Sequence, residues 1–132
     1  PAVVTADLSR KTLVPIGANA GLGFETAKRF AKVNPAQLVL TAKNEAKGEE
    51  AVARVLKETG YTNAGLWIID VANFSSVIAF VDRAESEFDR LDILVENVGM
   101  TTWEYERQLE DWERTYVDCS SRNLAYLSKC AD

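Results

Sequence analysis

The sequence predicts an α/β fold in which a parallel β-sheet is covered by α-helices on both faces. Short apolar runs alternate along the chain with longer amphipathic stretches, which is the pattern of repeated βαβ units. One run, residues 66–69 (LWII), is apolar at every position, as expected of a parallel strand buried on both faces. The 132 residues, 47% hydrophobic and 27% charged, contain no repeat or linker, so residues 1–132 are expected to form a single domain.

The first part of the chain predicts a strand, a turn, a helix and a second strand. Residues 11–16 (KTLVPI) form the first strand, and residues 17–23 form a glycine-rich turn. Small and apolar residues then recur at helical spacing over residues 23–33, and Asn34-Pro35 ends this helix. Residues 37–42 (QLVLTA) form the second strand.

The middle of the chain predicts two more helices and two more strands. Residues 45–59 form a helix with one apolar face, and Gly60 is a suitable C-terminal cap. After the third strand, LWII, Ser75 or Ser76 is expected to cap a third helix. Residues 91–95 (LDILV) form the fourth strand.

A last helix is predicted to begin near Leu109 and to end near Lys129. Along it, apolar and aromatic residues recur at alternating three- and four-residue spacing, interrupted at Asn123, and form a seam on one face. The seam consists of Leu109, Trp112, Tyr116, Cys119, Tyr126 and Cys130.

The composition excludes several classes of function. With 20 acidic and 15 basic residues the formal net charge is −5, so the chain lacks the basic footprint of a nucleic-acid-binding protein. It has no histidine, which excludes Ser-His-Asp triads and histidine-based zinc sites, and its two cysteines are too few for a cysteine-only zinc site. We therefore expect no metal site. Reduced cysteines and apolar runs far shorter than a membrane span indicate a cytoplasmic protein.

The turn GANAGLG, between the first strand and the first helix, is the strongest functional signal. Gly17 and Gly21 permit a tight turn and close backbone approach, and Gly23 lets the helix pack on the sheet. Backbone N–H groups at the positive end of the helix would then face a pyrophosphate. The alternative is a tight strand-to-helix turn without a ligand, and the glycines favour nucleotide binding over it.

Three motifs together resemble the short-chain dehydrogenase/reductase family: the GxxxGxG turn, Asp70-Val71 after the third strand, and Glu96-Asn97-Val98-Gly99 after the fourth. The stretch GANAGLGFETAKRFA resembles the retinol-dehydrogenase-like and fungal-type members. The resemblance covers the family's amino-terminal half and implies a truncated Rossmann-type, doubly wound sheet of about four strands in the order 3-2-1-4. It also implies that the dinucleotide contacts Gly17, Asn19, Gly21, Leu22, Gly23, Asp70, Val71, Asn97 and Gly99.

The end of the second strand bears on the choice of cofactor. An NAD-type site usually has an acidic residue there, whereas this chain has Lys43 and no carboxylate. Related members commonly have arginine at this position, so the resemblance implies that Lys43 binds the 2′-phosphate of NADP(H), with NAD(H) as the weaker alternative. Lysine lacks the planar fork of arginine, which weakens the discrimination, and a solvated surface lysine is the competing interpretation.

Four positions depart from the family pattern. Pro15 lies inside a central strand, where its missing N–H removes a hydrogen bond of the sheet. Ile16 replaces a threonine whose hydroxyl helps to fix the turn. Glu96 replaces the first asparagine of the NNAG motif, and Asp118 stands where the family has its catalytic asparagine.

The family's catalytic elements are not found in this chain. Its members use a serine and a Tyr-x-x-x-Lys pair, whose two side chains lie one helical turn apart. The chain ends before these elements, and Tyr126 and Lys129 are three residues apart instead of four. We therefore expect no catalytic residue and no hydride transfer by the isolated chain.

Three functions remain open. The first is a dehydrogenase-like module that binds NADP(H) but is catalytically incomplete. The second is a non-enzymatic interaction protein that forms a homo-oligomer and binds partners through the seam of the last helix. The third is the amino-terminal part of a longer, active NADP-dependent oxidoreductase. Nucleotide binding separates the first function from the second.

Overall fold

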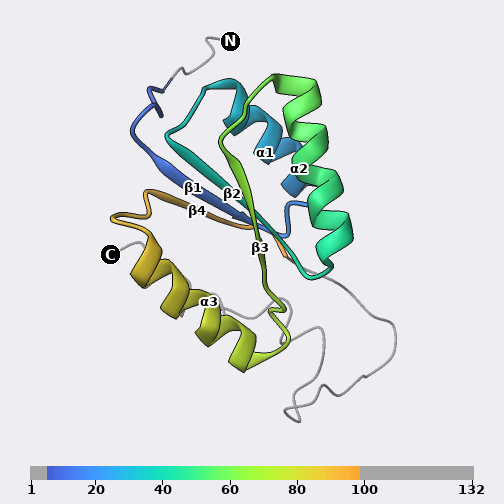
Figure 1. The fold of residues 1–132 in the computed structure, drawn as a ribbon, viewed down its shortest axis with the longest axis vertical. Coiled ribbons are helices and arrows are strands. Elements are labelled where there is room, and N and C mark those ends of the chain that lie inside the picture. The colour runs from blue at the N-terminus through green and yellow to red at the C-terminus, as the bar shows by residue number, and fades with distance from the viewer. Residues whose placement is uncertain (1–5, 99–132) are drawn as a thin grey trace.

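The computed structural model describes residues 6–98, which form a four-stranded parallel sheet between two layers of helices (Figure 1). Strands and helices alternate along the chain, and the strand order is β3-β2-β1-β4, as predicted. The elements are β1 (Thr12–Ile16), α1 (Gly21–Lys32), β2 (Gln37–Ala42), α2 (Glu45–Thr59), β3 (Ala64–Ile68), α3 (Phe74–Glu87) and β4 (Ile93–Glu96).

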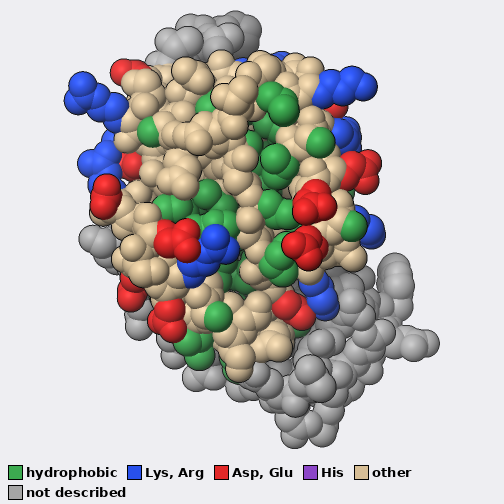
Figure 2. Space-filling view, in the orientation of Figure 1, with side chains coloured by type: hydrophobic (Ala, Val, Ile, Leu, Met, Phe, Trp, Pro, Cys, Tyr) green, Lys and Arg blue, Asp and Glu red, His purple; other side chains and the backbone are tan. Residues whose placement is uncertain are grey.

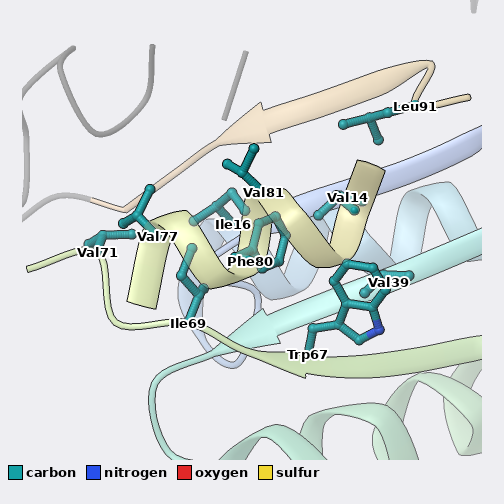
Figure 3. Packing of buried hydrophobic residues seen from close by; sticks show 11 residues of the cluster. Val14, Ile16, Val39, Trp67, Ile69, Val71, Val77, Phe80, Val81 and Leu91 are labelled. Carbon is teal, nitrogen blue, oxygen red and sulfur yellow. The ribbon is translucent and has the colours of Figure 1, made fainter. Parts of the chain in front are cut away.

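Because successive side chains of a strand point to opposite faces, the sheet has a separate hydrophobic core on each face. Leu38 and Leu40 of β2 pack with α1 and α2 on one face. Val39, between them in sequence, packs with α3 on the other face, in a cluster that includes Trp67 and Phe80 (Figure 3). The α3 face is therefore rich in aromatic contacts, and the rings of Trp67 and Phe80 meet edge to face with centroids 5.3 Å apart.

Several boundaries differ from those predicted. The bounds of β2 and α2 are as expected, and Gly60 at φ 74° ends α2 in the left-handed conformation. In contrast, α1 begins at Gly21, two residues before the predicted start, because Gly21 and Leu22 already belong to its first turn. β3 covers residues 64–68 and β4 residues 93–96, each displaced from its predicted range by one or two residues.

The predicted serine cap of α3 was wrong. Asn73 is the cap, and its side-chain oxygen accepts a hydrogen bond from the Ser76 N–H at 3.2 Å. Asn73 has the extended backbone that a cap residue requires, whereas Ser75 and Ser76 already lie within the helix. The Ser76 hydroxyl instead accepts the backbone N–H of Asp70 at 2.9 Å, which ties the helix to the loop after β3.

Lys and Arg side chains are interspersed with Asp and Glu side chains over the described part of the face in Figure 2, and no continuous basic patch is visible there. Among residues 6–98, no helix has the length and apolar character needed to cross a membrane. The predicted helix from Leu109 to Lys129, together with Gly99 and Asp118, lies outside the described residues.

Candidate functional site

The predicted site residues follow the carboxyl ends of the four strands, which lie at one edge of the parallel sheet. The glycine turn follows β1, Lys43 follows β2, Asp70 follows β3 and Asn97 follows β4. The chain leaves β1 toward β2 on one side and later returns to β4 on the other side, so the strand order reverses at β1. Ligands of doubly wound sheets bind outside the carboxyl ends of the strands at such a reversal.

The three glycines of the turn have different structural roles. Gly17 has φ 72°, and a Cβ there would lie 2.7 Å from a methyl carbon of Val98. A Cβ on Gly23 would overlap the carbonyl oxygen of Gly17 and lie 2.6 Å from Asn97 Nδ2, so only glycine lets α1 approach the turn this closely. Gly21 has φ 58° and open space where a Cβ would project.

The start of α1 can receive an anion. Its N-cap is Ala20, which makes no side-chain hydrogen bond to the first turn, and that turn contains no acidic residue. The positive end of the helix therefore has no competing carboxylate cap, and no atom lies within 4 Å of the place where a Cβ of Gly21 would project. Asn19 is half-buried, and the Leu22 side chain is 79% exposed. This geometry fits a pyrophosphate.

Thr41 of β2 anchors the turn from the neighbouring strand. Its hydroxyl accepts the N–H of Gly17 at 3.0 Å and donates to the carbonyl of Pro15 at 3.1 Å. Ile16 has no hydroxyl to offer the turn, and the Thr41 hydroxyl of the neighbouring strand bonds to it instead. Sequence reasoning missed this residue, although a threonine inside a buried apolar strand was a signal that its hydroxyl needs a partner.

Lys43 and Asp70 form an ion pair across the ends of β2 and β3. Lys43 Nζ lies 3.2 Å from Asp70 Oδ2, and the two side chains are 71% and 31% exposed. Asp70 Oδ1 accepts the Ala72 N–H at 3.0 Å, so its carboxylate is held in place. Lys43 is thus directed toward the site and is still accessible to a ligand.

The remaining predicted site residues are held differently. Val71 is only 7% exposed and belongs to the core beneath α3. The Asn97 side chain donates to the carbonyl oxygen of Gly17 at 3.4 Å and so joins the end of β4 to the turn. Glu96 is exposed and is aligned with Ile16 in the β1–β4 register. Among residues 6–98, no group of three or more Asp, Glu or Cys side chains is arranged to hold a metal ion.

Comparison with known proteins gives one consistent result. The model of the short chain dehydrogenase family matches residues 11–125. The short chain dehydrogenase sor7 of Hypocrea jecorina is 31% identical over 96% of this chain and 37% of its own length. The short-chain dehydrogenase/reductase ffsI of Aspergillus flavipes is 32% identical over 97% of this chain and 38% of its own.

Solved structures agree with these sequence relatives. A short-chain dehydrogenase from Sphingobium yanoikuyae in complex with NADPH superposes with a TM-score of 0.75 at 26% identity. The match covers 91% of this chain and 46% of that one. The present chain thus spans less than half the length of each of these relatives. With the glycine turn at the reversal of the strand order and a family match over residues 11–125, the chain belongs to the short-chain dehydrogenase family.

Proposed function

We propose that this chain is the dinucleotide-binding part of a short-chain dehydrogenase and that it prefers NADP(H) to NAD(H). The observation that carries the proposal is the open space in front of Gly21, at the uncapped start of α1, with an exposed lysine at the end of the adjacent strand. The relative from Sphingobium yanoikuyae, whose structure was solved with NADPH, supports the same assignment.

Each part of the cofactor has a place in this proposal. The pyrophosphate lies against Gly21 and the first N–H groups of α1, where the helix dipole favours negative charge. The Asp70-Val71 loop, which follows β3, contacts the adenosine. Lys43 turns from Asp70 toward the 2′-phosphate, which carries more negative charge than one carboxylate.

The bound nicotinamide would supply hydride chemistry, but the 132 residues contain no Tyr-x-x-x-Lys pair to supply the proton. We therefore propose that these 132 residues bind the dinucleotide without by themselves transferring hydride. Three further predictions stay untested. They are self-association through the seam that begins at Leu109, a partner-binding role without catalysis, and a cytoplasmic location.

Calorimetric titration with NADPH and NADH tests the binding proposal. We expect saturable binding of both and tighter binding of NADPH. Lys43→Ala should weaken NADPH binding roughly fivefold and leave NADH binding unchanged, because an exposed charge contact is worth about 1 kcal/mol. Lys57 is an exposed lysine in the last turn of α2. Lys57→Ala is the matched control and should change neither the NADPH affinity nor the NADH affinity. Absence of saturable heat at millimolar NADPH would refute the proposal.

A further inference from the structure

We infer that Thr41 is a positioning residue for dinucleotide binding, because its buried hydroxyl sets the conformation of the glycine turn. The inference rests on the proposed function, since the turn is the proposed pyrophosphate site. Thr41 itself does not face the ligand, because its side chain is completely buried.

Thr41 holds two successive backbone groups of the turn. Its hydroxyl accepts the Gly17 N–H at 3.0 Å, and its backbone carbonyl accepts the Ala18 N–H at 3.0 Å. The hydroxyl proton is directed to the carbonyl of Pro15, 3.1 Å away. The end of β1 and the beginning of the turn are thus both fixed to a single residue of β2.

This connection is needed because β1 contains a proline. The aligned pairs between β1 and β2 are Thr12 with Gln37 and Leu13 with Leu38, whereas the pairing with β4 continues to Ile16. Pro15 has no N–H with which to continue a backbone ladder. Ile16 has no hydroxyl to offer the turn either, and the Thr41 side chain bonds to it three residues beyond Leu38, the last aligned partner in β2.

The position of Gly17 in turn determines where α1 begins. Gly17 adopts φ 72°, and its carbonyl oxygen accepts the Asn97 side chain and lies against Gly23 of α1. Rotation about the φ and ψ bonds of Gly17, which join its N–H to its carbonyl group, would move this oxygen and would displace the first turn of the helix. Without the Thr41 hydroxyl the N–H of Gly17 loses its acceptor, and the N–H groups proposed to hold the pyrophosphate lose their fixed position.

The chain contains a matched control for this arrangement. The Thr59 hydroxyl also accepts one backbone N–H, from Tyr61 at 3.2 Å, and donates to one carbonyl, of Val55 at 2.6 Å. It lies at the C-terminal end of α2, whereas the glycine turn precedes α1. Thr59→Val therefore removes one accepted and one donated hydrogen bond, as Thr41→Val does, but at a place away from the glycine turn.

The experiment measures NADPH and NADH affinity by calorimetry for Thr41→Val, Thr41→Ser and Thr59→Val. Thr41→Val should bind both nucleotides about tenfold or more weakly, because both carry the pyrophosphate. Thr41→Ser keeps the hydroxyl and should bind within about threefold of the unsubstituted chain, and Thr59→Val should bind normally. Wild-type affinity in Thr41→Val, or an equal loss in Thr41→Ser, would overturn the inference. If Thr41→Val does not fold, Thr41→Ala serves as the hydroxyl-free variant.

Amide hydrogen exchange without nucleotide separates this inference from the proposed function. Removal of the Thr41 hydroxyl should accelerate exchange at Gly17 and Ala18 about tenfold, with the serine variant close to the unsubstituted chain. Unchanged exchange in the hydroxyl-free variant overturns the role of Thr41. Failure of the unsubstituted chain to bind NADPH overturns the proposed function instead, and the exchange result then decides whether Thr41 sets the turn.

Discussion

Substitution of Gly23 by alanine gives the sharpest test of the turn geometry, because two effects predict changes of opposite sign in the free energy of unfolding. Gly23 lies in the first turn of α1, where helix propensity alone favours alanine over glycine by about 1 kcal/mol. The new Cβ, however, would overlap the Gly17 carbonyl oxygen and lie 2.6 Å from Asn97 Nδ2. A carbonyl of the main chain cannot move aside as the end of a flexible side chain can.

The expected magnitude follows from these contacts. Overpacking of a closely packed site costs typically about 1–3 kcal/mol. Loss of the hydrogen bond from Asn97 to Gly17 adds about 1 kcal/mol, which roughly cancels the gain in helix propensity. Gly23→Ala should therefore lower the free energy of unfolding by about 1–3 kcal/mol, and it should also weaken NADPH binding because α1 is displaced from the turn.

Urea unfolding of the Gly23→Ala and Gly65→Ala variants measures how each substitution changes the free energy of unfolding. Gly65 lies in β3 and has no atom within 4 Å of the position of a Cβ, so its substitution should be neutral or stabilising by up to about 1 kcal/mol. If Gly23→Ala were as stable as the unsubstituted chain, or more stable, helix propensity would outweigh the close approach. That result would show that position 23 does not require glycine.

Two further predictions concern sites outside the turn. The backbone N–H of Thr12 donates to Asp92 at 2.8 Å and lowers the pKa of that carboxyl. The ionised carboxylate therefore stabilises the fold at pH values above the ordinary pKa of aspartate. This stabilisation is lost as the pH falls through the lower pKa of Asp92 in the folded state. Thermal melts of Asp92→Asn should show a deficit near neutral pH that shrinks in acid, and a deficit independent of pH would contradict this. Asn73→Ala should lower the urea unfolding free energy by about 1 kcal/mol through loss of the α3 cap, and a change below about 0.3 kcal/mol would argue against a capping role.

Most of the fold could be predicted from the sequence because its signals are local. The run QLVLTA and the helix that ends at Gly60 carry their own boundaries, and both were predicted to the residue. The start of α1 was misplaced because Gly21 looks like a turn residue, although a positive φ is compatible with the first position of a helix. The α3 cap was misplaced because three residues within four positions, Asn73, Ser75 and Ser76, can all cap a helix.

The site could be predicted less completely because its contacts join distant parts of the chain. The glycines and Lys43 could be recognised from their spacing and from the family resemblance. The ion pair between Lys43 and Asp70 and the hydrogen bonds of Thr41 join residues more than 20 positions apart, and no local pattern encodes them. Asn97 was expected to contact the dinucleotide, whereas its hydrogen bond to Gly17 depends on the alignment of β4 with β1 and could not be predicted.

A strand that is apolar on both faces does not specify its own register, because a slip by one residue replaces one apolar face with another. β2 is such a strand: Leu38 and Leu40 face one core and Val39 faces the other. Thr41 breaks this degeneracy, since its hydroxyl meets Pro15 and Gly17 in a single alignment and would be buried without a partner after a slip in either direction. One hydroxyl group thus distinguishes the native alignment of the central strands from alternatives of nearly equal hydrophobicity.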